Sequence, residues 1–234
     1  MAHILDPLND GISSIELVRS GGSDIDVVNA ARVSYGSRVD ELVERDHKLI
    51  KYLISHDHTS PFEHTQLVYR IKTPIYVVRE WMRHRIGVSY NEISGRYAEL
   101  PMEFYVPREW RVVNPANKQS SIPGKIEKEE EAFLAYKKLI EDASKTYHDL
   151  LKMGVCRELA RGVLPVCIYT QFIFTCNLIS LFHFVRLRAH WTAQWEIQQY
   201  AKGLLKLARP HFPISISAWE DTKADPELKQ QLEV

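Results

Sequence analysis

The sequence predicts an α+β fold in which helices flank a central, mostly antiparallel sheet. Residues 66–72 alternate apolar with polar side chains, which is the two-residue period of a strand with one solvated face. Residues 133–150 instead repeat apolar side chains at helical spacing, behind an acidic start at residues 127–131. Because the predicted strands and helices mostly do not follow one another in βαβ order, the α+β class is favoured over a parallel sheet.

The N-terminal third is predicted to supply two strands and two helices. A short strand covers residues 12–19, and Ser23 offers an N-cap for the helix that follows. A second helix carries its apolar stripe within residues 42–54 and must end before Pro61, because proline disfavours a helical conformation in the residue before it. Residues 55–62 are therefore expected to form a loop that leads into the alternating strand.

The middle of the chain is predicted to contain two further helices. Pro74 suits the first turn of a helix whose buried side runs from Ile75 to Met82 and whose C-terminal end presents Arg83-His84-Arg85. The Pro/Gly/Ser-rich residues 114–124 are expected to form a loop. The long amphipathic helix follows this loop, and Gly154 is a plausible stop signal for it.

The C-terminal third is predicted to add one strand and two helices. Residues 163–174 are rich in β-branched and aromatic side chains and are interpreted as a buried strand, although periodicity alone does not separate this from a helix. Helices are expected at about residues 180–188 and 192–208, the second ending ahead of Pro210. The polar residues after Asp221 are expected to fray.

The composition favours a single soluble domain of the cytoplasm. The chain has 234 residues, of which 45% are hydrophobic, so it can bury one sizeable core. Thirty basic and thirty acidic residues cancel, and no global field attracts nucleic acid or an anionic membrane. The N-terminus has no basic region followed by a long apolar run. Residues 1–234 are therefore expected to form one domain, with a polar tail after about residue 221 and no membrane or nucleic-acid partner.

The three cysteines give little sign of a metal or disulfide framework. Cys156, Cys167 and Cys176 are odd in number and lack metal-ligand spacing. A reducing compartment fits this pattern best, because disulfide frameworks belong to oxidising ones.

Residues 83–97 form the densest polar stretch of the chain. Three arginines, a histidine, two serines, an asparagine and a glutamate lie in one loop-like segment, with Gly87 and Gly95 relaxing its backbone. Guanidinium groups match phosphate oxygens with paired donors, so the segment predicts a nucleotide phosphate site. For any single arginine, pairing with Glu80 or Glu92 on a solvated helix end would be the better interpretation, but it does not explain the whole run.

The same segment carries a family resemblance. Arg83-His84-Arg85, eight residues, and then Ser94-Gly95-Arg96-Tyr97 resemble the signature of the flavin-dependent thymidylate synthases. The resemblance extends over residues 30–34, 58–64, 161–165, Asn177, 187–188 and 193–197, and so covers the chain from about Ala30 to Ala208.

The resemblance implies an enzyme that binds FAD, NADPH, methylenetetrahydrofolate and dUMP and makes dTMP, with FAD as hydride carrier. It also implies a homotetramer whose subunits share the active sites. By motif, the residues placed at the flavin are Ser34, His58, Ser60, Glu63, Arg83, His84, Arg85, Glu92, Asn177 and His183. Those placed at dUMP are Glu80, Arg83, Glu92, Ser94, Gly95, Arg96, Arg161 and Arg188.

Two positions depart from the family pattern. Glu80 stands where relatives often have glutamine, and it lies one turn before Arg83 and His84, so it is expected to orient them instead of touching the nucleotide. Ile179 stands where some relatives have arginine. A neighbouring chain or backbone amides would then have to serve the flavin there.

The chemistry of uracil gives Arg188 a catalytic role under this resemblance. The C5 carbon is a poor nucleophile and needs either thiol addition at C6 or stabilisation of charge on the ring. Cys167 and Cys176 lie in apolar sequence that raises a thiol pKa, and Cys156 has only Arg157 beside it. A fixed cation at the developing oxyanion is the alternative, and Arg188 at a predicted helix end is the candidate. Ser94 lacks a supporting base and is expected to act as a hydrogen-bond donor.

Three other interpretations are less favoured. A metal site at His56, His58 and His64 is disfavoured because Pro61 interrupts regular structure between them. An interaction surface on residues 127–151 is disfavoured because an aromatic stripe is more typical of a core. Nucleic-acid binding is disfavoured by the neutral charge and the lack of a known module. It would use Arg79, Arg83, Arg85, Arg96, Arg108, Arg111, Tyr90, Tyr97 and Trp110.

Overall fold

A five-stranded antiparallel sheet organises the fold. The computed structural model describes residues 4–232. The strands lie in the order β1-β2-β3-β7-β4, and every neighbouring pair is antiparallel. Their bounds are β1 Ile4–Leu5, β2 Ser14–Gly21, β3 Gln66–Pro74, β4 Val88–Glu92 and β7 Tyr169–Cys176. The predicted α+β fold with a central antiparallel sheet is confirmed.

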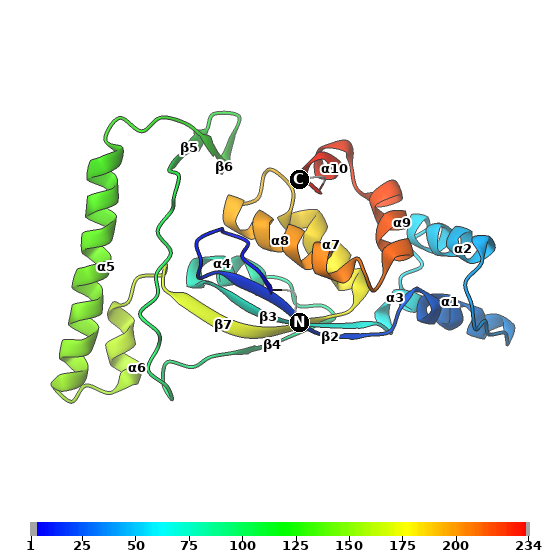
Figure 1. Ribbon diagram of the computed structural model, residues 1–234, viewed down its shortest axis with the longest axis horizontal. Helices are drawn as coiled ribbons and strands as arrows, with labels where there is room; N and C mark the ends of the chain where they lie inside the picture. The colour runs from blue at the N-terminus through cyan, green and yellow to red at the C-terminus, as the bar shows by residue number, and fades with distance from the viewer. Residues whose placement is uncertain (1–3, 233–234) are drawn as a thin grey trace.

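The two faces of the sheet differ in polarity. On β3, Leu67, Tyr69 and Ile71 are buried, whereas Arg70 between them is exposed and pairs with Glu16 of β2 at 3.2 Å. The predicted two-residue period of this strand is therefore confirmed. Figure 1 shows the helices of residues 178–208 over one side of the sheet.

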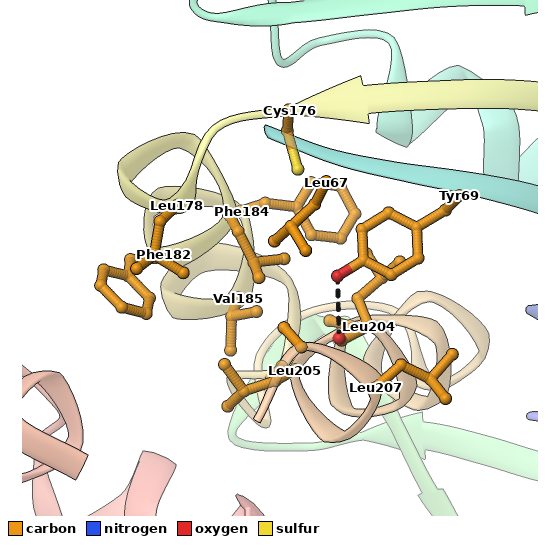
Figure 2. Packing of buried hydrophobic residues seen from close by; sticks show 14 of the residues in the cluster. Leu67, Tyr69, Cys176, Leu178, Phe182, Phe184, Val185, Leu204, Leu205 and Leu207 are labelled. Carbon is orange, nitrogen blue, oxygen red and sulfur yellow. Dashed lines mark hydrogen bonds between the residues drawn. The ribbon is translucent and has the colours of Figure 1, made fainter. Parts of the chain in front are cut away.

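Three helices supply the core that covers this face. They are α4 (Ile75–Trp81), α7 (Leu178–Arg188) and α8 (Trp195–Ala208). Trp81, fully buried, has its ring centroid 4.8 Å from that of Phe184 on α7 and 5.7 Å from that of Tyr200 on α8. In Figure 2 the Tyr69 hydroxyl donates to the Leu204 carbonyl at 3.1 Å, which ties the sheet to α8. This packing fixes the ends of α4 and α7 relative to each other.

The remaining helices of the main body bring the N-terminal and C-terminal parts of the chain into contact. They are α1 (Asp24–Arg32), the 3-10 turn η1 (Val33–Tyr35), α2 (Glu44–Ser55), α3 (Ser60–Glu63), α9 (Pro213–Lys223) and α10 (Pro226–Leu232). The buried Asp24 carboxylate accepts from the amides of Ile214 and Ser215 at 2.8 and 2.9 Å, which caps the first turn of α9. α2 packs against α9. The predicted helices after Ser23 and within residues 42–54 are confirmed.

A long helix stands apart from the sheet. α5 (Glu129–Lys152) projects beside the body in Figure 1, joined to it through α6 (Arg157–Ala160), η2 (Arg161–Val163) and the hairpin β5 (Arg111–Asn114) and β6 (Asn117–Pro123). Arg111 pairs with the buried Glu196 of α8, and its guanidinium carbon lies 4.9 Å from the Trp195 ring centroid. This pair fastens the hairpin to the body. Gly154 has φ +88°, as a helix stop requires.

Several segments differ from their predicted structure. Residues 83–97 are not a continuous loop, because β4 pairs with β7 as an edge strand whose Val88 and Tyr90 pack against the core. Residues 114–124 form most of a hairpin, not a loop. The strand predicted at residues 163–174 begins only at Tyr169, since Pro165 enters a turn in which its carbonyl accepts from the Ile168 amide at 3.0 Å.

Smaller differences occur at helix ends. The short helix α3 begins inside the predicted loop 55–62, with Pro61 in its first turn. Met82 is exposed, and Trp81 takes the buried position instead. The tail expected to fray forms the end of α9 and all of α10, with Leu228 buried. Within residues 4–232, no helix has the length and apolar character of a membrane span.

Candidate active site

Arg188 lies where the C-terminal ends of α4 and α7 meet. Its Nη1 donates to Glu80 Oε2 at 3.1 Å, and its Nη2 donates to the Glu80 carbonyl at 3.1 Å. Its Nε donates to His84 Nε2 at 3.0 Å. The side chain is 21% exposed, so the guanidinium is held in place yet reachable from solvent.

His84 accepts from Arg188 because it is neutral. The residue is buried, and burial, Arg188 and His183 together lower its pKa to about 4. The His183 ring centroid lies 5.5 Å from that of His84, and burial also lowers the pKa of His183. The two histidines and the cation therefore share one corner of the molecule without like-charge repulsion.

Glu80 acts on a different partner from the predicted one. Its carboxylate pairs with Arg188 across 108 residues of sequence, and within residues 4–232 the carboxylate makes no hydrogen bond or ion pair with Arg83 or His84. Burial raises the pKa of Glu80, and Glu196 adds to this while Arg188 opposes it. The Glu80 carbonyl accepts from the Arg83 amide at 3.4 Å, and Arg188 links the Glu80 carboxylate to His84. The orientation of Arg83 and His84 by Glu80 stays a prediction.

A second group of predicted residues gathers after β4. Ser94 Oγ accepts from the Arg96 amide at 3.3 Å, and the buried Gly95 faces Arg161 of η2. A Cβ on Gly95 would lie 3.0 Å from Leu100 and 3.3 Å from Arg161 Cδ, so only glycine lets these segments approach without a shift. Glu92, at the end of β4, accepts from Thr170 Oγ1 at 2.6 Å.

The turn between α4 and β4 is docked on the start of α7. Ser180 Oγ donates to the Ile86 carbonyl at 3.0 Å, and Asn177 caps α7 by accepting from the Ser180 amide at 2.9 Å. Gly87 has φ +66°, and a Cβ there would clash with Ser180 and lie 2.9 Å from Asn177 Nδ2. The turn therefore holds Ile86 and Gly87 against the N-terminus of α7.

Two of the predicted flavin residues, His58 and His183, border one pocket. A pocket of about 190 Å³ is lined by His58, Ile179 and His183, together with Arg186 and Lys223. Ser60 and Glu63 lie on α3, which contacts α7, and Thr59 Oγ1 donates to Glu63 Oε1 at 3.0 Å. Ser34 stands apart from this group, exposed in η1. Glu92 lies with the second group, beside β7.

The residues predicted to bind dUMP fall into two groups, one around Arg188 and one around Arg161, and the described residues of one chain do not join these groups. Among residues 4–232, no hydrogen bond or ion pair links Arg188, Glu80 and His84 with the turn of Ser94 to Arg96 or with Arg161. Strand β4 lies between them. The start of the signature segment reaches Arg188, whereas its end reaches Arg161.

The thiols and the histidine triplet are poor alternatives for the chemistry. Burial raises the pKa of both Cys167 and Cys176, so neither thiolate is available at neutral pH. His56 and His58 have ring centroids 6.4 Å apart, and no three His, Cys, Asp or Glu side chains converge as metal ligands anywhere in the described part of the chain.

Comparison with known proteins decides the family. Residues 16–214 match the family model described as thymidylate synthase complementing protein. The chain belongs to this family. A flavin-dependent thymidylate synthase of Thermus thermophilus is 44% identical over 207 residues, 88% of this chain and 75% of the relative. One from Thermosipho melanesiensis is 46% identical over 200 residues, 85% and 86% of the two chains.

A solved structure shares the fold. A UMP/dUMP methylase, PolB from Streptomyces cacaoi, bound with 5-Br dUMP, superposes with a TM-score of 0.82 and 35% identity. The match covers 91% of this chain and 96% of that one.

Sequence reasoning missed the residues that hold the predicted ones in place. Ser180 fixes the turn at Ile86, and Thr65 Oγ1 accepts from the Leu178 amide at 2.9 Å at the start of α7. Thr170 orients Glu92. These are single hydroxyl groups in apolar or helical sequence, and they carry no local signal, since their partners lie far away in the chain.

Proposed function

We propose that this protein is a flavin-dependent thymidylate synthase that methylates dUMP to dTMP. The observation that carries the proposal is the fixed Arg188 guanidinium, fastened by Glu80 and His84 within a family whose relatives bear that name. A cation held in this way can stabilise negative charge that develops on a pyrimidine carbonyl without moving. With both buried thiols protonated, charge stabilisation is the better supported route to an activated C5.

The proposed cofactor is FAD, with methylenetetrahydrofolate as carbon donor and NADPH as reductant. The residues fit such a group, because His58 and His183 border one pocket whose lining also includes the cationic side chains of Arg186 and Lys223. Bound there, FAD would supply the hydride. His84 stays neutral and Arg83 and Arg85 are exposed, so the chain offers donors for ring and phosphate atoms of one ligand.

The arginines of the site are proposed to bind different parts of the nucleotide, some the pyrimidine base and others the phosphate. Arg188 is already neutralised by Glu80, which suits a neutral pyrimidine ring. Arg83, Arg96 and Arg161 make no ion pair with a carboxylate within residues 4–232, so their full charge is free for a phosphate. Ser94 and the Gly95 amide add hydrogen-bond donors beside them.

The proposed assembly is a homotetramer with shared sites. The two groups of nucleotide-directed residues are unconnected in one chain, and a second subunit could bring them onto one ligand. Large apolar side chains that a partner could cover are exposed on α5, α6 and η2, namely Leu134, Leu139, Leu159 and Val163. A cytoplasmic location is proposed as well, since all three cysteines are free thiols.

Nucleic-acid binding gains no support from its predicted residues. Arg111 pairs with Glu196, and Trp110 packs edge-on against Tyr136 at 5.7 Å between ring centroids. Two of the expected cationic and stacking groups are thus engaged within the fold.

Purified protein tests the proposed function directly. A visible spectrum should show bound flavin, and dTMP should form only when dUMP, methylenetetrahydrofolate, NADPH and FAD are all present. UMP is the informative second substrate, because the structural relative is described as acting on both nucleotides. Methylation of UMP alone would replace dUMP as the substrate, and protein that binds no flavin and forms neither product would refute the proposal.

A further inference from the structure

Residue 80 holds both terminal nitrogens of Arg188. The Glu80 side chain accepts from Nη1 and its own carbonyl accepts from Nη2, each at 3.1 Å. Together with the bond from Nε to His84, these use three of the five N–H groups of a guanidinium. Two N–H groups remain for a ligand, and their direction follows from the position of Glu80 on the last turn of α4.

The charges around Glu80 come from three elements. Arg188 of α7 faces its carboxylate, and Glu196 of α8 acts on it from a longer range. Glu196 is itself paired with Arg111 of β5, and His84 after α4 is neutral. The ionised Glu80 therefore cancels the charge of Arg188 at short range and leaves its hydrogen bonds in place.

Resting on the proposed function, we propose that Glu80 is a positioning residue that aims the free N–H groups of Arg188 at the pyrimidine and weakens the pull of Arg188 on anions. The carboxylate does both through one contact. The orientation of the Arg188 N–H groups depends on the oxygen acceptor of residue 80. The weaker attraction of anions by Arg188 depends on the negative charge of the carboxylate. The two contributions can therefore be separated by substitution.

Glu80→Ala and Glu80→Gln separate the acceptor from the charge. E80A removes both, so kcat for dTMP should fall about 10-fold or more, because a misplaced guanidinium stabilises the transition state poorly. E80Q keeps an oxygen acceptor and should restore most of kcat. E220Q is the matched control, since Glu220 pairs with Arg209 at 2.9 Å away from the site, and it should leave kcat unchanged. Wild-type kcat in E80A, or equal losses in E80A and E80Q, would overturn the proposal.

The charge contribution is read from nucleotide binding across pH. The ratio of the wild-type Kd for dUMP to that of E80Q cancels titration of the nucleotide itself. It should rise from near one at acidic pH to a several-fold plateau as Glu80 ionises, because only the wild type gains a negative charge. A ratio that stays near one from acidic pH to neutral pH and above contradicts the proposal. This comparison decides even where E80A fails to fold.

Failure of this inference differs from failure of the proposed function. If the wild type binds no dUMP and makes no dTMP, the function itself is wrong. If the wild type is active while E80A matches it or the Kd ratio stays near one at every pH, only the role of Glu80 is wrong.

Discussion

His84 shows how one buried side chain links stability to the candidate site. Its Nε2 must carry a lone pair to accept from Arg188, so the folded protein holds the ring neutral. Burial, Arg188 and His183 lower its pKa from 6.5 to about 4. The unfolded chain therefore binds more protons than the folded chain between these two values, and the free energy of unfolding must fall as the pH drops through this window.

Replacing His84 with glutamine should remove most of that acid sensitivity. Wild-type protein is expected to lose up to roughly 3 kcal/mol between about pH 6.5 and 4 from this residue, since one pKa unit corresponds to about 1.4 kcal/mol. Urea unfolding of H84Q over the same range should show a smaller loss. His47 is exposed, so H47Q is the control and should keep the wild-type slope. Equal slopes in H84Q and wild type would show that His84 does not titrate as described.

Single residues were predictable where a motif carried them. Arg188 was predicted at a helix end, and it is the last residue of α7. The partner of Glu80 was not predictable, because Arg188 lies 108 residues away and only the packing of α4 against α7 brings them together. From the sequence, the expected partners of Glu80 were Arg83 and His84, because side chains three or four residues apart on a helix are neighbours.

At the scale of elements, the turn from Arg83 to Gly87 depends on its contact with α7. The Ile86 carbonyl and the close approach of Gly87 to Ser180 and Asn177 hold it there. The predicted flavin residues on both segments therefore keep a fixed spacing.

Gly87→Ala tests this contact against a second glycine. Gly36 has nearly the same backbone, φ +62°, but open space around it. G36A should cost about 1–2 kcal/mol for the left-handed backbone alone. G87A should cost about 1–3 kcal/mol more, because its Cβ meets Ser180 and Asn177, and should weaken flavin binding. Chemical denaturation and flavin titration measure both effects, and equal losses in the two variants would contradict the docked turn.

Elements with strong periodicity were predicted well, and polar strands were not. α2 and α8 bury apolar side chains that repeat at helical spacing, and the same spacing predicted α5 although its Leu134 and Leu139 are exposed. β4 and the β5–β6 hairpin carry few apolar residues, because β4 is an edge strand and the hairpin lies outside the sheet. Their pairing is decided by partners and not by their own composition.

At the scale of the whole molecule, the candidate site is in two parts. Arg188 and Arg161 belong to groups without a direct bond in one chain, and α5 projects from the body with exposed Leu134 and Leu139. Both features fit the proposed assembly, which the resemblance implied and a single chain does not display.

Mixed oligomers test whether the two parts come from different subunits. R188A and R161A should each be nearly inactive, but tetramers that contain both chains can combine an intact Arg188 with an intact Arg161. In isolated hybrids, up to roughly a quarter of the sites should be active, because random pairing of the two chains brings both intact arginines together in about that share of sites. Hybrids of R161A with R96A carry both defects in one group and should stay inactive. Hybrids of R188A and R161A as inactive as their parents would place the whole site within one chain.

The most direct test of the central claim is turnover of R188A alongside its flavin content. Arg188 is proposed to stabilise charge on the pyrimidine without holding the cofactor. R188A should therefore retain the visible flavin spectrum while dTMP formation falls roughly 100- to 1,000-fold, the usual loss for one such donor. Undiminished dTMP formation by flavin-loaded R188A would contradict the claim.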